Sequence, residues 1–560
     1  MGEVLAITCL ILVSVFSYIV LWFVRKQRVK HNLPLPPGPR KLPLLGNSLN
    51  MPSAFQWLTF SRWAKQFNSD VLHLEVAGGD YIILNSYEAI TDLLDKRSGI
   101  YSSRPHVTML QDLWDRDFLL MPYGEDLKAH RKLLQQEFHP TNTALHQPHE
   151  KRELVAFLNN LIEKPDEWLK HLRLYCLSSD QHAHRCMTGA TILAVAYGFH
   201  VQDLDDPNIV AVEEALAVLN SAAIPGAFIV YTFIMLIPFF LSKDVFPILK
   251  YVPYWFPGAS FKRKAREWNG TLSAAVTPPF IQVKQAMVAG NAQDSFSSRC
   301  LKNAKNTDPR PDHLSSEEEI IKETAGTMYE GGSDTGVNVL RTFILAMTCF
   351  PHVQREAQEE LDRVVGKDRL PDYDDLSKEL LPYLCAVIYE TFRWQPVAPL
   401  AFPHRLDADD AYKGYHIPKG STVIPNVWAV FYNEKIYGPD VHTFEPKRWL
   451  LEISDEQGKG WKINPDMRDP ATVAFGFGRR VCPGKHMGLS SFRIIAASLL
   501  HSFNISPPLN KFGEPVVPKI EYISGLVHYP VPFKCSIKPR SEGHVTLMQQ
   551  SLWNLEIGDC

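Results

Sequence analysis

The sequence predicts a mainly α-helical protein with small β-sheets, built as a single large domain behind an N-terminal transmembrane helix. Three observations lead to this prediction. An uncharged apolar run opens the chain, helical patterns dominate its middle, and the strand-like runs are short. Of 560 residues, 45% are hydrophobic and 21% are charged, a globular balance that excludes wholesale disorder. The charge sum is 58 − 61 = −3, so we expect no nucleic-acid partner.

Residues 1–30 are predicted to form the membrane anchor. Val4–Val24 contains no charged residue, and at about 1.5 Å per residue it can cross a hydrocarbon core of about 30 Å. Trp22 and Phe23 end the run, and a basic flank follows over residues 25–30. This order predicts a single-pass protein of the endoplasmic reticulum membrane whose body faces the cytosol. The alternative, a cleaved signal peptide, would have a shorter apolar core and a small-residue cleavage site.

Residues 31–45 are predicted to be a hinge, because Pro34–Pro39 (PLPPGP) fixes an extended backbone. Residues 46–540 show no internal repeat and no long polar linker, so we expect one catalytic domain there. Residues 541–560 are interpreted as a C-terminal tail.

Strand-like runs at Val71–Val76 and Tyr81–Leu84 flank a glycine turn and predict a hairpin. Further on, Ser315–Cys349 predicts one long helix, with acidic residues in its first turn and a proline just beyond its end. Gly331-Gly332 stands in its centre, where each glycine costs about 1 kcal/mol relative to alanine. These glycines either pack against a bulky group or loosen the backbone for a purpose.

Two more helices are expected at Leu380–Trp394 and Lys485–Phe503. Between them, Phe475–Gly484 (FGFGRRVCPG) is rich in glycine and contains Cys482. Backbone N–H groups and the start of the next helix would surround this sulfur and favour its thiolate form. The ordinary alternative, a buried structural cysteine, leaves the two adjacent arginines of the loop unexplained.

This loop resembles the signature of the cytochrome P450 family, Phe-x-x-Gly-x-Arg-x-Cys-x-Gly. All five fixed positions match, at Phe475, Gly478, Arg480, Cys482 and Gly484. The resemblance implies a haem b cofactor whose iron takes the Cys482 thiolate as axial ligand. It also implies that Phe475 packs near the sulfur, that Arg480 pairs with a haem propionate and that Gly484 belongs to the cofactor-binding loop.

Other family motifs occur in the expected order. Glu390 and Arg393 match the family's Glu-x-x-Arg, and Arg448 in FEPKRW matches the third member of that structural network. Arg131 and Arg405 match further propionate partners, a task suited to the arginine fork. Leu127 stands where the family usually has tryptophan, which removes one expected hydrogen bond to a propionate.

Gly331–Thr335 resembles the oxygen-side signature of the family's central helix. By this resemblance Asp334 and Thr335 are catalytic residues that pass protons, through water, to the oxygen being reduced. Gly336 departs from the pattern, where a second hydroxyl residue is usual. The alternative is a weak helical site with a local Asp–Thr hydrogen bond.

Within the family the chain resembles fungal membrane-bound enzymes of secondary metabolism, of the O-methylsterigmatocystin oxidoreductase and tryptamine hydroxylase types. Residues 174–184 and 231–243 look inserted relative to those enzymes. One hypothesis is that both are retained introns of a gene model. For the second stretch, an apolar segment that dips into the membrane is an equal alternative.

The resemblance implies a haem-thiolate monooxygenase that splits dioxygen and oxidises an apolar small molecule of terpenoid or aromatic (indole) type. Electrons would come from NADPH–cytochrome P450 reductase, docked near Arg479 and Lys485. The pocket is expected to draw on Arg104–Met121, Leu216–Phe228, Thr327–Asp334, Val397–Phe402 and Ser524–Leu526. Two alternatives stay open: a haem-thiolate isomerase or dehydratase that needs no external electrons, and a non-functional product of an unspliced gene model.

Overall fold

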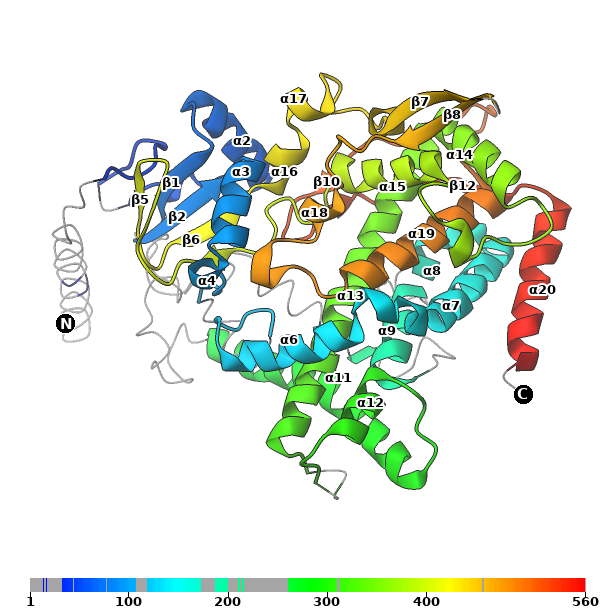
Figure 1. Cartoon of the computed structure of the whole chain (residues 1–560), viewed down its shortest axis with the longest axis horizontal. Coiled ribbons are helices and arrows are strands. Elements are labelled where there is room, and N and C mark those ends of the chain that lie inside the picture. Colours follow the sequence, from blue (N-terminus) through cyan, green and yellow to red (C-terminus); the bar gives the residue numbers. More distant parts are fainter. Residues whose placement is uncertain are drawn as a thin grey trace, which may run out of the picture.

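The computed structural model describes residues 33–106 (except 44 and 77), 118–172, 187–199, 260–455 (except 309, 311 and 312) and 458–558. Isolated positions at 14, 17, 210–211 and 214–215 are also described. The predicted membrane run therefore lies almost wholly outside the described residues, as do the stretches 174–184 and 231–243. In Figure 1 one β-rich region lies at the left of the molecule, a further strand pair lies at its upper right, and helices make up most of the remainder.

The largest sheet has four strands in the order β1-β2-β6-β3. The predicted hairpin is confirmed: β1 pairs with β2 antiparallel, and β2 then pairs with β6 in parallel. One face of this sheet packs against α2 (Gln56–Gln66), where Phe60, Leu72 and Ile83 belong to one buried apolar cluster, while the other face joins the main core. The strands are β1 (Val71–Val76), β2 (Gly79–Leu84), β3 (His404–Arg405), β4 (Asp410–Tyr412), β5 (Tyr415–Ile417), β6 (Thr422–Pro425), β7 (Leu450–Asp455), β8 (Gly458–Ile463), β9 (Phe503–Ser506), β10 (Tyr522–Ile523), β11 (Tyr529–Pro530) and β12 (Ser536–Pro539).

The helical elements carry most of the core. They are η1 (Ser48–Asn50), α2 (Gln56–Gln66), α3 (Tyr87–Ile90), η2 (Thr91–Lys96), α4 (Ser98–Tyr101), α6 (Glu125–Glu137), η3 (Pro140–Asn142), α7 (Thr143–Glu163), η4 (Pro165–Glu167), α8 (Trp168–Leu172), α9 (Met187–Tyr197), α11 (Ser260–Ala289), α12 (Phe296–Asn303), α13 (Ser316–Cys349), α14 (Pro351–Val364), η6 (Tyr373–Asp375), α15 (Pro382–Trp394), α16 (Val427–Phe431), α17 (Glu434–Tyr437), η7 (Pro446–Trp449), α18 (Ala471–Ala474), η8 (Gly478–Arg480), α19 (Lys485–Ser502) and α20 (Glu542–Gly558).

Helix α13 is the predicted long helix, with 34 residues. A capping box fixes its start, because Ser315 and Glu318 each bond the other's backbone N–H. Pro351 opens α14 at a bend of 104°. Helices α6, α9, α11, α15 and α19 all contact α13, so this helix lies at the centre of the domain.

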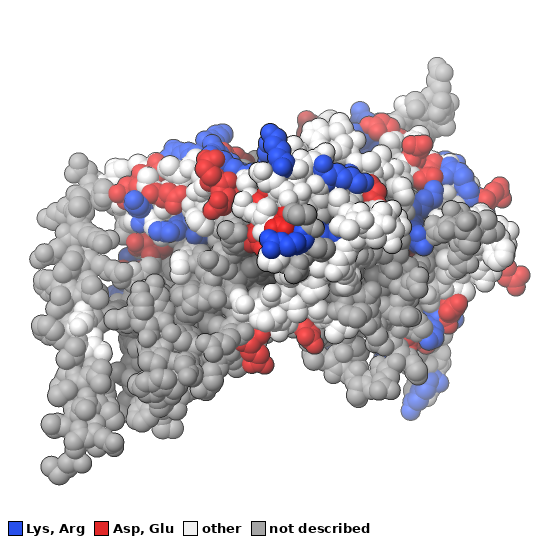
Figure 2. All heavy atoms as spheres, turned by 90° about the horizontal axis from the view of Figure 1, so that it is seen from below, with Lys and Arg blue, Asp and Glu red and all other residues white. Residues whose placement is uncertain are grey.

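The segment interpreted as a tail forms α20, which packs on α7 and buries Met548. Within the described ranges no single helix is both long and apolar enough to cross a bilayer, and only the bent pair α13 and α14 meets those criteria jointly. On the face drawn in Figure 2, acidic and basic side chains of the described residues are interspersed.

Candidate active site

The loop that contains Cys482 runs from the end of α18 to the start of α19. It closes on itself, because the Cys482 N–H donates to the Phe475 carbonyl at 2.8 Å. Gly478 makes the closest approach to the rest of the protein. Its φ is +55°, and a Cβ there would lie 2.0 Å from the carbonyl oxygen of Leu94. Only glycine satisfies both conditions, which accounts for this fixed position of the signature.

The Cys482 side chain is exposed, whereas Cys385 and Cys535 are buried. Burial raises the pKa of Cys385 to about 11 and that of Cys535 to about 12. Surrounding protein atoms desolvate Cys482 and so raise the pKa of its thiol. The Gly484 N–H, Arg131 and Lys485 act in the opposite direction and lower that pKa. Cys482 thus combines an accessible sulfur with groups that stabilise a thiolate.

The three arginines expected to face the cofactor differ in their partners. Arg131 on α6 is buried and donates to the Val481 carbonyl at 2.7 Å, which ties α6 to the loop. Burial lowers the pKa of Arg131, and the nearby Cys482 opposes that effect. Arg480 is also buried and donates to backbone carbonyls of Ser102 (2.7 Å), Phe118 (3.3 Å) and Met121.

Arg405 on β3 is half-buried. Its backbone N–H donates to Ser103, yet no hydrogen bond or ion pair engages its guanidinium among the described residues. Phe475 and Gly484 complete the loop. The Phe475 ring packs against the Phe392 ring, with 5.6 Å between the two ring centroids. A Cβ on Gly484 would meet no protein atom within 4 Å.

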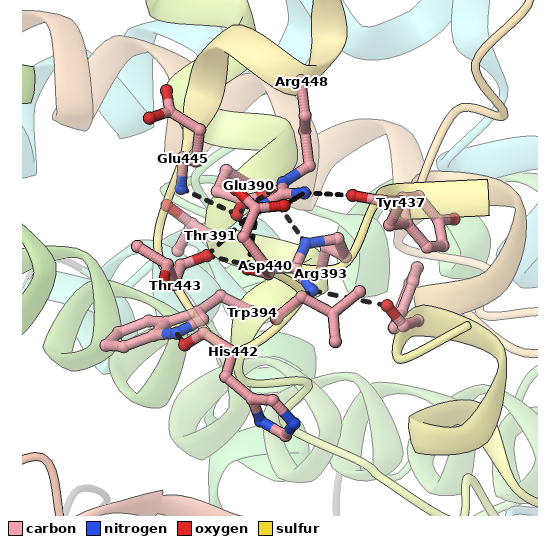
Figure 3. Close-up of polar contacts among 12 residues, drawn as sticks. Glu390, Thr391, Arg393, Trp394, Tyr437, Asp440, His442, Thr443, Glu445 and Arg448 are labelled. Atoms are coloured by element: carbon pink, nitrogen blue, oxygen red, sulfur yellow. Dashed lines mark hydrogen bonds and ion pairs between the residues drawn. The ribbon is translucent and has the colours of Figure 1, made fainter. Parts of the chain in front are cut away.

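Glu390, Arg393 and Arg448 meet in one buried network (Figure 3). Arg393 donates to both oxygens of Glu390 at 2.7 Å, and Arg448 Nε donates to Glu390 Oε1 at 3.1 Å. Burial alone would lower the pKa of Arg393, but the Glu390 carboxylate outweighs it and raises that pKa. Arg393 also donates to the carbonyls of Phe431 and Val441, so the network fixes the segment that leads from α16 to η7.

Trp449 is a member of this network that the sequence analysis missed. Its indole N–H donates to Glu390 Oε2 at 3.0 Å, and the Glu445 N–H donates to Oε1 at 2.9 Å. Both residues belong to the FEPKRW motif that had already indicated Arg448. A tryptophan next to a matched arginine was the available signal.

The two adjacent glycines of α13 have different surroundings. A Cβ on Gly332 would lie 2.6 Å from the side chain of Ile192 on α9, whereas a Cβ on Gly331 would meet nothing within 4 Å. Gly332 therefore permits close helix packing, and Gly331 faces open space. Thr335 is exposed and its hydroxyl donates to the Gly331 carbonyl at 2.7 Å. Asp334 is half-buried, and its carbonyl accepts from Asn338 at 3.0 Å.

Comparison with known proteins identifies the family. The family model described as "Cytochrome P450" matches residues 36–534. The chain belongs to the cytochrome P450 family.

Fungal relatives match almost the whole chain. A cytochrome P450 monooxygenase of Rhodocybe pseudopiperita (ple1) is 38% identical, and the match covers 93% of this chain and 92% of the relative. Tryptamine 4-monooxygenase of Psilocybe cyanescens is 38% identical, with 95% and 98% covered. Cytochrome P450 monooxygenase 98 of Postia placenta is also 38% identical, with 95% of each chain covered. The predicted family, enzyme class and haem-thiolate cofactor are thereby confirmed.

The residues of this cytochrome P450 fit a haem. The sulfur of Cys482 is accessible, Gly484 and Gly331 border open space, and Arg405 has a guanidinium free to pair with a carboxylate. Arg131 and Arg480 already bind backbone carbonyls, so each would share its remaining donors with a propionate.

Of the segments expected to form the pocket, residues 107–117 and 216–228 lie outside the described residues. The segments at Val397 and Ser524 are each hydrogen-bonded to another part of the chain. The Val397 carbonyl accepts from the His528 N–H at 2.7 Å, and the Ser524 hydroxyl accepts from the Phe55 N–H at 2.7 Å.

Proposed function

We propose that this P450 oxidises an apolar small molecule of fungal secondary metabolism, of aromatic (indole) or terpenoid type, with electrons from NADPH–cytochrome P450 reductase. The relative named tryptamine 4-monooxygenase supports an indole-type substrate. Small apolar side chains in the predicted pocket segment Val397–Phe402 are compatible with either class.

The accessible sulfur of Cys482 carries the proposal. It lies in a loop closed by its own backbone hydrogen bond, next to the Arg131 guanidinium. We assign Cys482 as the axial ligand and Arg131, Arg405 and Arg480 as partners of the two haem carboxylates. When bound, haem supplies the activation of dioxygen and the insertion of one oxygen atom into a C–H bond.

Asp334 and Thr335 are the proposed proton carriers. The Thr335 hydroxyl donates its hydrogen to the Gly331 carbonyl, so the lone pairs of Oγ1 can accept a hydrogen bond from water. Rotation of that hydroxyl would then release its own proton toward the open side of α13. The Asp334 carboxyl one residue earlier is half-buried and can resupply protons from solvent.

We further propose that the body stands on the cytosolic face of the endoplasmic reticulum membrane, held by residues 4–24. The reductase would dock on the side of the Cys loop, where Arg479 and Lys132 are exposed and Lys485 is half-buried. Acidic groups on a partner would complement these cations.

The test is expression of the full chain together with a reductase. The reduced, carbon monoxide-bound protein should show the thiolate-type spectrum, and product formation should require NADPH. Cys482→Ser should abolish both, whereas Cys385→Ser, which changes a buried cysteine away from the loop, should preserve both. An enzyme that converts its substrate without NADPH would refute the proposal and favour an isomerase or dehydratase.

The same expression system addresses substrate and gene model. Tryptamine, a terpenoid panel and extracts of the host's metabolites serve as probes. Chains with and without residues 174–184 and 231–243 should be compared, because a retained intron would prevent haem incorporation only in the longer chain.

A further inference from the structure

A buried carboxylate connects the helix that follows Cys482 to two other parts of the protein. Glu150 on α7 is 4% exposed. Its Oε1 accepts from the Ser491 hydroxyl at 2.5 Å, and its Oε2 accepts from the Tyr373 hydroxyl at 2.7 Å and from the Ser490 hydroxyl at 3.4 Å. Three elements (α7, η6 and α19) therefore meet at one side chain.

Among the described residues, no lysine or arginine forms an ion pair with Glu150. The adjacent Lys151 is bound instead to Asp372 at 2.8 Å. Burial raises the pKa of Glu150, and its three hydroxyl contacts lower it only partly. A carboxyl group buried without a cation is costly, so its place in the core calls for an explanation beyond stability.

The two serines differ from several threonines within the helices. Thr335, Thr348 and Thr391 each donate to the carbonyl four residues earlier in their own helix. Ser490 and Ser491 instead donate away from α19, to a residue on another helix. Their contacts therefore fix the rotation of α19 about its axis and its position along it.

The orientation of α19 bears directly on the sulfur. The helix begins at Lys485, three residues after Cys482, and its first backbone hydrogen bond runs from the Gly488 N–H to the Gly484 carbonyl at 2.8 Å. At the same end, the Lys485 N–H donates to the Cys482 carbonyl at 3.4 Å, so the start of α19 is bonded to the cysteine itself. A rotation of α19 would therefore move the Cys482 backbone and the sulfur it carries, and the surroundings of a ligating sulfur tune the metal site.

We propose that Glu150 is a positioning residue for the haem-thiolate centre: through Ser490 and Ser491 it holds α19, and with it the Cys482 backbone to which the start of α19 is hydrogen-bonded. This inference rests on the proposed role of Cys482. It concerns the quality of the thiolate ligand and not the identity of the substrate.

The experiment uses the full-length, haem-loaded enzyme and needs no substrate. Its readouts are the midpoint reduction potential, the share of the carbon monoxide complex in the thiolate form, and the melting temperature. Glu150→Ala removes all three contacts. Glu150→Gln keeps the shape, and because hydroxyl groups can accept as well as donate, it should preserve the network.

Glu150→Ala should shift the reduction potential and lower the thiolate-form share, and the double variant Ser490→Ala/Ser491→Ala should do the same. Glu150→Gln should restore the thiolate-form share. The matched control is Glu360→Ala, because Glu360 is equally buried but accepts the N–H groups of Tyr383 and Leu384 at the start of α15. It should lower the melting temperature without moving the other two readouts.

The inference is overturned if Glu150→Ala melts earlier but keeps the wild-type potential and spectrum, or if Glu360→Ala shifts them equally. A wild-type protein without a thiolate-type spectrum would refute the proposed function itself. The two failures are therefore distinguishable.

Discussion

Replacement of Glu390 by glutamine should be among the most damaging isosteric changes in this protein. Glu390 is fully buried and receives only donors: two groups of Arg393, the Arg448 Nε–H, the Trp449 indole and the Glu445 N–H. A glutamine keeps the shape but turns one acceptor oxygen into an NH₂ group that faces other donors. It also leaves two arginines without their shared counter-ion.

The expected cost follows from these contacts. Breaking a buried ion pair by removing one partner costs about 3–5 kcal/mol, and native domains have only about 5–15 kcal/mol of stability in total. Glu390→Gln should therefore lower the urea midpoint strongly and reduce the yield of haem-loaded protein. Tryptophan fluorescence and the haem absorbance, followed through urea unfolding, measure both effects.

Glu360→Gln is the matched control, since Glu360 is also a buried carboxylate but accepts two backbone N–H groups. Glutamine would turn one acceptor into a donor at either site, but Glu360 neutralises no buried arginine, since Arg363 at 4.0 Å is 70% exposed. Burial also raises the pKa of Glu360, so loss of its charge should cost less than at Glu390. Equal urea midpoints for the two variants would refute the reasoning. A near-normal Glu390→Gln protein would show that the network contributes only packing.

Three further predictions concern single positions. Gly478→Ala places an alanine at a positive φ, which costs about 1–2 kcal/mol, and brings its Cβ into the Leu94 backbone. Its urea midpoint should therefore fall well below that of Gly484→Ala, whose Cβ meets no protein atom within 4 Å. Equal midpoints for the two variants would contradict this geometry. Burial lowers the pKa of His528 to about 4. As the pH falls below about 6.5, the unfolded state therefore binds a proton that the folded state does not. The free energy of unfolding should fall by about 1.4 kcal/mol per pH unit until about pH 4. His528→Phe should flatten the acid limb of stability against pH by one proton, and an unchanged slope would exclude His528 as its source. Arg405→Leu should leave the unfolding of the apoprotein unchanged but speed haem transfer to apomyoglobin, and wild-type transfer would remove Arg405 from the cofactor site.

The sequence predicted the elements whose local signals are strong. The Ser315 cap and Pro351 delimit the long helix almost to the residue, and alternation around a glycine turn places the β1–β2 hairpin. The helix at Lys485 was likewise expected within one residue of its observed end. In each case the information lies in neighbouring residues, so no tertiary contact is needed to read it.

Other features depend on contacts between distant segments. No local pattern separates Gly331 from Gly332, because only the approach of Ile192 from α9 makes the second glycine a packing position. Residues 541–560 looked like a tail, yet the Asn159 side chain on α7 donates a hydrogen bond to the Met548 carbonyl at 3.0 Å and so anchors α20. Glu150 escaped notice for the same reason, since its partners are more than 200 residues away.

Several buried polar groups of this P450 contact the Cys loop or the helix that follows it. The Cys loop is irregular and rich in glycine, so its own backbone preferences leave its shape undetermined. Apolar packing would hold it close to the core but would not fix direction, because the hydrophobic effect is non-directional. Hydrogen bonds from Arg131 and Arg480 hold the loop itself, and Glu150 acts on the helix that leaves it. Burying Arg131, Arg480 and Glu150 costs desolvation free energy, which offsets much of what their hydrogen bonds contribute to stability. We therefore expect these side chains to orient the sulfur more than they stabilise the fold.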